Sequence, residues 1–373
     1  MLRVGIIGGS IAGLSVANVL ARLGHEVAVF ERGARGFEAR GGGLGLDPDL
    51  AGALRPGARP PPSLGIERRR VWTPRGETEM RASITVTAYG ALWSWLREGL
   101  GAGALRQGVS ARIDDAGAEG RRPRLEVGGE RLTDLDLVVC AEGGDSASRG
   151  SLRVGAGRRA YAGYVLVRGV VAARHLDPAE RLAERFHVAS TETRHFVAYP
   201  IPGPGGESSP EARSLNWGLY VPLDDAALRD LAGAEADAPH AIDRSTAPAA
   251  AAFALAEAER GPLPRWARHL IEASTARGSI APHPVYDYIA GALVDGRVVL
   301  AGDAAHLASP ITGSGARMAM TDALALGACL REGPTLGRAL RAYEALRLEP
   351  SAAVVRAGRE FGARLQPPGA GAA

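Results

Sequence analysis

Three apolar segments open the chain in the order strand, helix, strand. Residues 2–7 form a short continuous apolar run, which is typical of a strand buried on both faces of a parallel sheet. Residues 11–23 carry apolar side chains at helical spacing, and Gly24 follows as a helix stop. Residues 26–31 form a second apolar run. This order predicts a right-handed βαβ unit.

The pattern becomes less regular over the next hundred residues. Residues 33–45 are rich in glycine and predict a loop, whereas residues 68–87 predict paired strands. Residues 92–100 carry the apolar stripe of an amphipathic helix. Residues 135–141 predict another buried strand, which ends in a Gly-rich turn.

Residues 161–223 have a different texture from the rest of the chain. Aromatic and β-branched runs follow one another without helices between them, which predicts an antiparallel sheet. Residues 224–274 are rich in alanine and predict helices that break at Pro239, Pro248 and Pro262. The strand-and-helix pattern of the first segment then returns.

This alternation predicts an α/β protein with two interleaved domains. We expect a discontinuous Rossmann-like domain over residues 1–155 and 285–350, and an antiparallel-sheet substrate domain over residues 156–284. Strands near residues 68–88 are candidates to join the second domain. Residues 366–373 predict a disordered tail.

Composition and charge exclude several classes of protein. The net charge of +3 over 373 residues comes from scattered arginines, and no aromatic residues accompany the short basic clusters, so we expect no nucleic-acid partner. Cys140 and Cys329 lack metal-ligand spacing and fit a reducing cytoplasm. No apolar run reaches the roughly 18 residues of a membrane span. We therefore expect a cytoplasmic monomer or homodimer without a metal ion or a membrane partner.

The first loop has the form of a dinucleotide fingerprint. The sequence GGSIAG at residues 8–13 lies between the first strand and helix and matches G-x-G-x-x-G, with Ser10 at the second glycine. Glu31 ends the next strand at about the expected twenty residues, where a carboxylate accepts ribose hydroxyls. A simple tight turn is the structural alternative, but strand, helix and acid together favour dinucleotide binding.

A second loop of similar design lies near the other end of the chain. Residues 296–323 predict a strand, a turn at Gly302 and Asp303, and a helix that opens near Gly315. The N-terminus of a helix stabilises negative charge, such as that of a reduced flavin. The chain has no second fingerprint for a nicotinamide dinucleotide. Both loops together predict one long cofactor held at its two ends.

These motifs resemble the group A flavin-dependent aromatic hydroxylases. GGSIAG, Glu31-Arg32, CAEGGDSASR and GDAAH…P…GSG…D carry the resemblance, and YAGYVLVRGVV with FVAYPIPG is similar to the 2,6-dihydroxypyridine 3-monooxygenase branch. The resemblance implies a fold like that of para-hydroxybenzoate hydroxylase, with non-covalent FAD, NAD(P)H as electron donor and O2 as co-substrate. It also implies insertion of one oxygen atom into an electron-rich aromatic or heteroaromatic substrate through a flavin C4a-hydroperoxide.

The resemblance assigns cofactor contacts to this chain. It places Glu31 at the adenosine ribose, Asp303 at the ribityl-pyrophosphate portion and Asp322 in a structural role. The implied FAD-binding residues are Gly8, Ser10, Ile11, Ala12, Gly13, Glu31, Arg32, Gly45, Asp303, Gly313, Ser314 and Gly315.

Two positions depart from the family pattern. Glu142 stands where the family's Asp-Gly turn has aspartate, although Ser146 and Arg149 match the rest of that motif. Tyr89 stands where the family commonly has arginine, so that a pyrophosphate contact is lost or is supplied by another arginine, Arg97 or Arg32.

Candidate catalytic residues lie on the later strands and near the second loop. We expect the substrate site to use His283, Arg168, Tyr199 and Pro310. His283 is a candidate to reach the pocket, Arg168 either steers an anionic substrate or supports the fold, and Pro310 shapes the flavin face. Other candidates have structural alternatives, namely core packing for Asn216, Trp217 and Tyr220, a sheet face for His195 and loop hydrogen bonding for His306.

Two other functions fit the same motifs. One is an FAD-dependent epoxidase, N-oxygenase or oxidative cyclase in natural-product tailoring. The other is a flavin-binding redox sensor that performs no oxygenation, which the departures at Glu142 and Tyr89 would suit.

Overall fold

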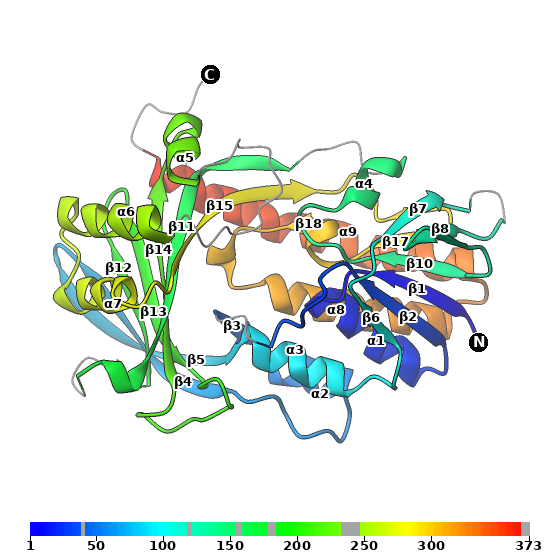
Figure 1. The fold of residues 1–373 in the computed structure, drawn as a ribbon, viewed down its shortest axis with the longest axis horizontal. Coiled ribbons are helices and arrows are strands. Elements are labelled where there is room, and N and C mark those ends of the chain that lie inside the picture. The colour runs from blue at the N-terminus through cyan, green and yellow to red at the C-terminus, as the bar shows by residue number, and fades with distance from the viewer. Residues whose placement is uncertain (39–41, 118–120, 154–158, 178–183, 233–246, 367–373) are drawn as a thin grey trace.

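Two large sheets organise the chain (Figure 1). The computed structural model describes residues 1–38, 42–117, 121–153, 159–177, 184–232 and 247–366. Within these residues, no helix is long and apolar enough to cross a membrane. No group of three His, Cys, Asp or Glu residues among them could hold a metal ion.

The six-stranded sheet contains the N-terminal βαβ unit. Its order is β16 (Val294–Asp295), β17 (Val298–Leu300), β10 (Leu137–Cys140), β1 (Arg3–Ile7), β2 (Glu26–Glu31) and β6 (Leu105–Gln107). All neighbours pair in parallel except β16 and β17. Helices α1 (Ile11–Arg22) and α8 (Gly315–Glu332) pack against each other below this sheet. The carboxyl ends of β1, β2 and β10 therefore open toward the N-terminus of α1.

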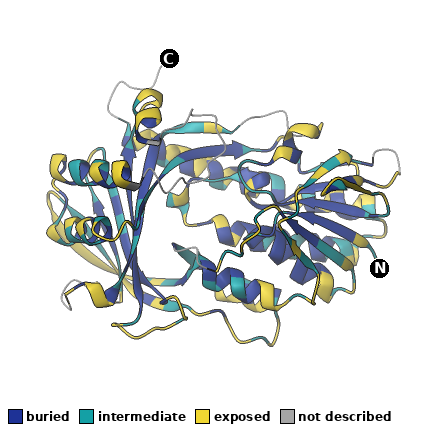
Figure 2. Cartoon of the chain, viewed as in Figure 1, coloured by how far each residue is buried: buried dark blue, intermediate teal, exposed yellow. Residues whose placement is uncertain are grey.

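The nine-stranded sheet stands across from it. Its order is β18 (His306–Leu307), β15 (Ile280–Ile289), β11 (Ala160–Ala172), β14 (Ser214–Pro222), β13 (His195–Ile201), β12 (Arg185–Ser190), β4 (Leu64–Thr73), β5 (Gly76–Ala88) and β3 (Gly43–Leu46). Helices α6 (Ala247–Arg260) and α7 (Arg265–Thr275) cover its outer face. The central strands of both sheets are buried in Figure 2, whereas β4 and β5 are largely exposed or intermediate. The other face turns toward the six-stranded sheet (Figure 1).

Smaller elements complete the described chain. The remaining helices are α2 (Pro48–Leu54), α3 (Tyr89–Glu98), α4 (Ala147–Ser151), α5 (Asp225–Ala232) and α9 (Leu336–Leu365), and the short turns are η1 (Ala173–His175), η4 (Gly302–Ala304) and η5 (Pro310–Thr312). A three-stranded sheet contains β7 (Ala111–Asp115), β8 (Arg124–Val127) and β9 (Glu130–Leu132).

Several expectations about the sheets need correction. The nine-stranded sheet, expected to be antiparallel, contains one parallel pair, β12 with β4, among antiparallel neighbours. Strand β3 occupies part of the segment expected to be a loop, because its glycines allow it to lie against bulky side chains. Strand β15 runs without a break through residues 284 and 285, where the boundary between the two domains was expected. Strands β4 and β5 lie in this sheet, within the segment proposed to join it.

Two further expectations concern helices. Pro248 lies in the first turn of α6 and does not break it, because a proline near a helix start loses no internal hydrogen bond. Helix α9 continues to Leu365, beyond the expected domain end at residue 350. Of the expected tail, Gln366 donates a hydrogen bond to the Gly163 carbonyl (2.7 Å), and residues 367–373 lie outside the described residues, as does Pro239.

Candidate active site

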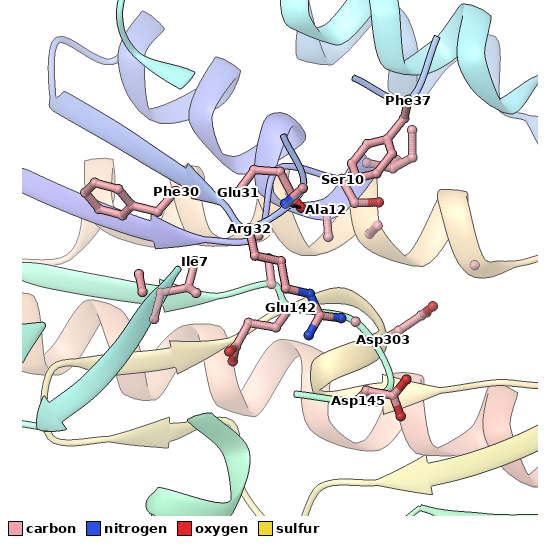
Figure 3. A pocket seen from close by; sticks show the side chains of 18 of the residues that line it. Ile7, Ser10, Ala12, Phe30, Glu31, Arg32, Phe37, Glu142, Asp145 and Asp303 are labelled. Carbon is pink, nitrogen blue, oxygen red and sulfur yellow. Dashed lines mark hydrogen bonds between the residues drawn. The ribbon is translucent and has the colours of Figure 1, made fainter. Parts of the chain in front are cut away.

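One cavity joins the two loops that the sequence singles out. It has a volume of about 660 Å³ and lies among the first loop, the end of β2, the turn after β10 and the start of α8 (Figure 3). Its lining includes these predicted cofactor residues: Gly8, Ser10, Ile11, Ala12, Glu31, Arg32, Asp303 and Gly315. This volume is within the usual range of cofactor sites.

The first loop needs glycine at its two ends for steric reasons. Gly8 has a φ of 105°, and a Cβ added to it would lie 2.3 Å from the Ala141 carbonyl oxygen. A Cβ on Gly13 would lie 1.9 Å from the Gly8 carbonyl oxygen. The loop therefore closes tightly onto β10 and onto its own helix. Gly13 supports the cavity from below and does not line it.

Glu31 is oriented by backbone donors. The N–H of Gly9 donates to Oε2 (2.8 Å), and the N–H of Gly33 donates to Oε1 (2.7 Å). The Trp93 indole N–H donates to the Gly9 carbonyl (2.7 Å), which fixes the same loop from the opposite side. The carboxylate is thus held in one orientation at the end of β2, where it lines the cavity.

The second loop is anchored by a buried carboxylate. Asp322 accepts hydrogen bonds from the Gly302 N–H (2.8 Å), His306 Nε2 (2.6 Å) and Arg347 Nε (2.7 Å). The side chains of Asp322 and His306 are 0% and 2% exposed. The hydrogen bond between His306 and Asp322 supports the alternative in which His306 has a structural role in the loop. Asp322 connects α8, α9 and the η4 turn, so that Asp303 is presented to the cavity.

The charged side chains of this loop shift one another's pKa values. Burial disfavours the charged form of His306, but the Asp322 carboxylate outweighs that effect and raises the pKa of His306 above its ordinary value. Burial likewise disfavours the charged form of Asp322, but His306 and Arg347 outweigh it and lower the pKa of Asp322. The Asp303 carboxyl is open to the cavity, yet desolvation by the dense protein around it and the nearby Asp322 raise its pKa.

Two helix N-termini suited to negative charge open onto the cavity. Ser10 is the N-cap of α1 and Ser314 is the N-cap of α8, and neither side chain caps its own helix. Backbone N–H groups of a first turn without such a cap are suited to bind an anion. Gly313 and Ser314 precede Gly315 but do not line the cavity. Gly45 packs closely against this loop, since a Cβ added to it would lie 3.2 Å from the Gly313 carbonyl oxygen. The residues present therefore fit a cofactor with anionic groups along its length.

Three predicted catalytic residues share the inner face of the nine-stranded sheet. Arg168 Nε donates to His283 Nε2 (2.8 Å), across the neighbouring strands β11 and β15. Tyr199 stacks on Phe186 at 4.9 Å and lies so close to β3 that a Cβ on Gly43 would be 2.5 Å from its ring. Burial raises the pKa of Tyr199 to about 12, against the opposing effect of the Arg168 charge. The structure brings these side chains together beside β3.

The other candidates divide between the two faces of the sheet. Asn216 Oδ1 accepts a hydrogen bond from the Gly43 N–H (2.8 Å), on the same side as Tyr199. Trp217 points the opposite way and donates to Ser274 Oγ (2.8 Å) on α7, which agrees with the core-packing alternative for this residue. His195 contacts Ser190, and burial lowers its pKa to about 4, which keeps it neutral. Pro310 is exposed and opens the η5 turn.

The cavity also contains residues that the sequence did not assign to it. Tyr89 and Glu142, the two departures from the family pattern, both line it, as does Asp145 (Figure 3). Glu142 accepts from Ser146 Oγ (2.6 Å), which orders the turn after β10. A polar turn directly after a buried parallel strand is a signal that would have found Asp145, because strand ends of such sheets gather at one edge.

Comparisons with known proteins agree on the cofactor. The FAD binding domain family matches residues 240–357, a FAD binding domain-like family matches residues 161–259, and an NAD(P)-binding Rossmann-like domain matches residues 6–37. The solved 2,6-dihydroxypyridine-3-hydroxylase of Arthrobacter nicotinovorans superposes with a TM-score of 0.86 at 24% identity, covering 99% of this chain and 95% of that one. Klebsiella pneumoniae HpxO, solved with FAD and uric acid, gives a TM-score of 0.75 at 23% identity over 97% and 88%.

Curated relatives match almost the whole chain. The 3-amino-4-hydroxybenzoate 2-monooxygenase PtnB3 of Streptomyces platensis is 32% identical over 96% of this chain and 87% of its own length. The 2,6-dihydroxypyridine 3-monooxygenase of Paenarthrobacter nicotinovorans is 25% identical over 98% and 91%. These matches confirm the expected fold and the use of FAD, with NAD(P)H as the typical electron donor. At such identity over nearly its full length, this chain belongs to the group A FAD-dependent aromatic hydroxylases and is an FAD-dependent monooxygenase.

Proposed function

We propose that this monooxygenase hydroxylates an aromatic or heteroaromatic ring that already carries a hydroxyl or amino group. The observation that carries the proposal is the Arg168–His283 pair beside Tyr199 on the inner sheet face. An electron-rich ring suits these polar neighbours. The relatives named for 3-amino-4-hydroxybenzoate, 2,6-dihydroxypyridine and 6-hydroxynicotinate all act on rings of this kind.

We further propose how FAD lies in the cavity. Its pyrophosphate would meet the start of α1, its adenosine ribose would meet Glu31, and its ring would extend toward Gly315 at the start of α8. Asp303 would contact the portion between them. When bound and reduced by NAD(P)H, FAD supplies the activation of O2 and the transfer of one oxygen atom.

The protein's own groups would bind and orient the ring to be hydroxylated. His283 Nε2 accepts from Arg168, so this imidazole carries its hydrogen on Nδ1 and is held in one orientation on the inner sheet face. The Arg168 cation favours the deprotonated form of a ring hydroxyl, which is the more reactive form toward an electrophilic oxygen. Tyr199, neutral near pH 7, would act as a hydrogen-bond donor. Pro310 would bound the site at the η5 turn.

The domain division accompanies this proposal. The discontinuous FAD-binding part would comprise residues 1–155 and the chain after Ala290, and the sheet from residue 156 onward would cover the ring. Strands β4 and β5 would belong with that sheet, since they extend it.

A substrate screen tests the proposed function. Purified FAD-loaded protein is offered phenols, aminophenols, hydroxypyridines and their carboxylated forms, and NAD(P)H consumption is measured together with product mass under labelled O2. We expect at least one ring to stimulate NAD(P)H consumption and to gain a single labelled oxygen on carbon. Oxygen on nitrogen or across a double bond would instead support the tailoring oxygenase. Conversion of all electrons to hydrogen peroxide with every ring would support the redox sensor.

A further inference from the structure

The two unusual residues of the cofactor loops contact each other. Ser10 replaces the second glycine of the fingerprint, and Tyr89 occupies the place where the family commonly has arginine. Their hydroxyl oxygens lie 2.5 Å apart, although the residues are 79 positions apart in the sequence. Both side chains line the cavity. The two departures are therefore one local arrangement.

The surrounding structure holds both hydroxyls in place. Ser10 is the N-cap of α1, and its hydroxyl contacts Tyr89 instead of capping its own helix. Tyr89 begins α3, and its backbone N–H donates to the Gly42 carbonyl (2.9 Å). Its ring meets Phe37 edge to face, with 6.3 Å between centroids and 84° between planes. These contacts hold the Tyr89 hydroxyl beside the start of α1.

Carboxylates predominate among the described ionisable side chains around this pair. Among the described residues, the ionisable side chains that line the cavity are Glu31, Arg32, Glu142, Asp145 and Asp303. Four of these five are acids, while the pyrophosphate of FAD carries negative charge. Helix N–H groups and hydroxyl groups can bind phosphate oxygens without requiring a cation.

We propose that Ser10 and Tyr89 form a paired hydroxyl clamp that binds the FAD pyrophosphate in place of the family's arginine. Each of the two hydroxyls is a donor as well as an acceptor, so the pair can present a donor to a phosphate oxygen. The inference rests on the proposed position of FAD, with its pyrophosphate at the start of α1. On this inference, Tyr89 is a cofactor-binding residue, and the Ser10 side chain takes part in binding FAD and is not merely a tolerated replacement for glycine.

Titration of apo-protein with FAD, followed by quenching of flavin fluorescence, tests the clamp. Tyr89→Phe and Ser10→Gly should each weaken FAD binding about ten-fold, the effect expected of one hydrogen bond to a charged group. The double variant should be little weaker than either single variant, because the two hydroxyls act as one unit. Ser10→Gly is the sharper variant, since it restores the fingerprint glycine and would strengthen binding if serine were only a tolerated replacement.

Salt dependence gives a second readout. The native protein and Tyr89→Phe should show the same dependence of FAD affinity on salt, because the Tyr89 hydroxyl contributes a hydrogen bond and not an ion pair that salt screens. The Ser10→Gly/Tyr89→Arg variant should regain affinity at low salt and lose it at high salt. Tyr161→Phe is the matched control, because the Tyr161 hydroxyl donates to the Leu223 carbonyl (2.9 Å) and does not line the cavity. This variant should bind FAD as the native protein does.

The outcomes separate this inference from the proposed function. Native protein that takes up no FAD would overturn both. Native protein that binds FAD, with Tyr89→Phe and Ser10→Gly binding equally well, would overturn the clamp alone. Circular dichroism and thermal melting of each apo-protein establish that a loss of affinity is not a loss of fold, and Ser10→Gly remains informative if Tyr89→Phe does not fold.

Discussion

Replacement of Asp322 by asparagine removes one negative charge while it nearly keeps the side chain's shape. In the native protein this carboxylate receives three hydrogen bonds, from Gly302, His306 and Arg347, at 2.8, 2.6 and 2.7 Å. Asp322 is 0%, His306 2% and Arg347 8% exposed. Asp322→Asn therefore leaves two buried cationic groups without their shared counter-charge.

The expected loss of stability is large. Removal of one partner from a buried ion pair costs about 3–5 kcal/mol, because the remaining charge is buried and uncompensated. The asparagine carbonyl can still accept from the Gly302 N–H, so the η4 turn keeps one of its contacts. We therefore expect the free energy of unfolding of Asp322→Asn to be lower than that of the native protein by roughly this amount at about pH 6.

The loss should depend on pH with a definite sign. The folded-state pKa of His306 is raised, so its contribution to stability is complete below its unfolded pKa of about 6.5 and is lost as the pH rises through the folded value. The folded-state pKa of Asp322 is lowered, so its contribution is present above about 3.9 and is lost as the pH falls through the folded value. The difference between native protein and variant should thus shrink on the alkaline side.

Equilibrium unfolding in guanidinium, followed by circular dichroism at several pH values, measures this difference. Glu349→Gln serves as control, because Glu349 and its partner Arg356 have side chains that are 77% and 47% exposed, and such an exposed pair should contribute only about 1 kcal/mol or less. A loss in Asp322→Asn no greater than in the control, or one that does not vary with pH, would refute the assigned charges.

Three further changes probe other parts of the site. Gly13→Ala places a methyl group against the Gly8 carbonyl, so the purified variant should lose its flavin absorbance on dialysis; retention of FAD would show that the loop can open. Arg168→Met should raise the KM for the ring substrate about ten-fold or more without changing the FAD affinity, measured by steady-state kinetics and FAD titration, because a cation that orients the ring is lost. Trp217→Phe should lower the free energy of unfolding by about 1–2 kcal/mol and leave KM unchanged, since the lost hydrogen bond to Ser274 lies on the far face of the sheet; a raised KM would contradict that placement.

The spacing of apolar and turn residues predicted those helices and strands whose formation depends on residues close to them in the sequence. Residues 26–31 form a strand over the expected bounds, and the helix that begins at Ile11 follows the expected apolar spacing. The two nucleotide loops could be predicted as well, because a strand, a glycine turn and a helix start are adjacent in sequence. Their meeting in one cavity followed from the rule that strand ends of a parallel sheet gather at one edge.

Long-range pairing could not be predicted in the same way. Strand β14 is buried on both faces for nearly its whole length, so its sequence lacks the alternation that would have placed Trp217 on the helix-covered side. Strand β3 is a strand only because β5 returns beside it, and its glycines alone predict a loop. The contact between Ser10 and Tyr89 depends on the approach of α3 to α1, which no local pattern records.

The order of strands along the chain limits how this enzyme can be divided. The chain leaves the six-stranded sheet after β2 and returns to it at β6. It leaves this sheet again after β10 and returns at β16 and β17, and the next strand, β18, belongs to the nine-stranded sheet. No single cut therefore releases either sheet intact. An engineer who wished to exchange the nine-stranded sheet with that of a relative would need matched junctions at several places, and the two-residue strand β18, directly after the η4 turn, would be the most exacting of them.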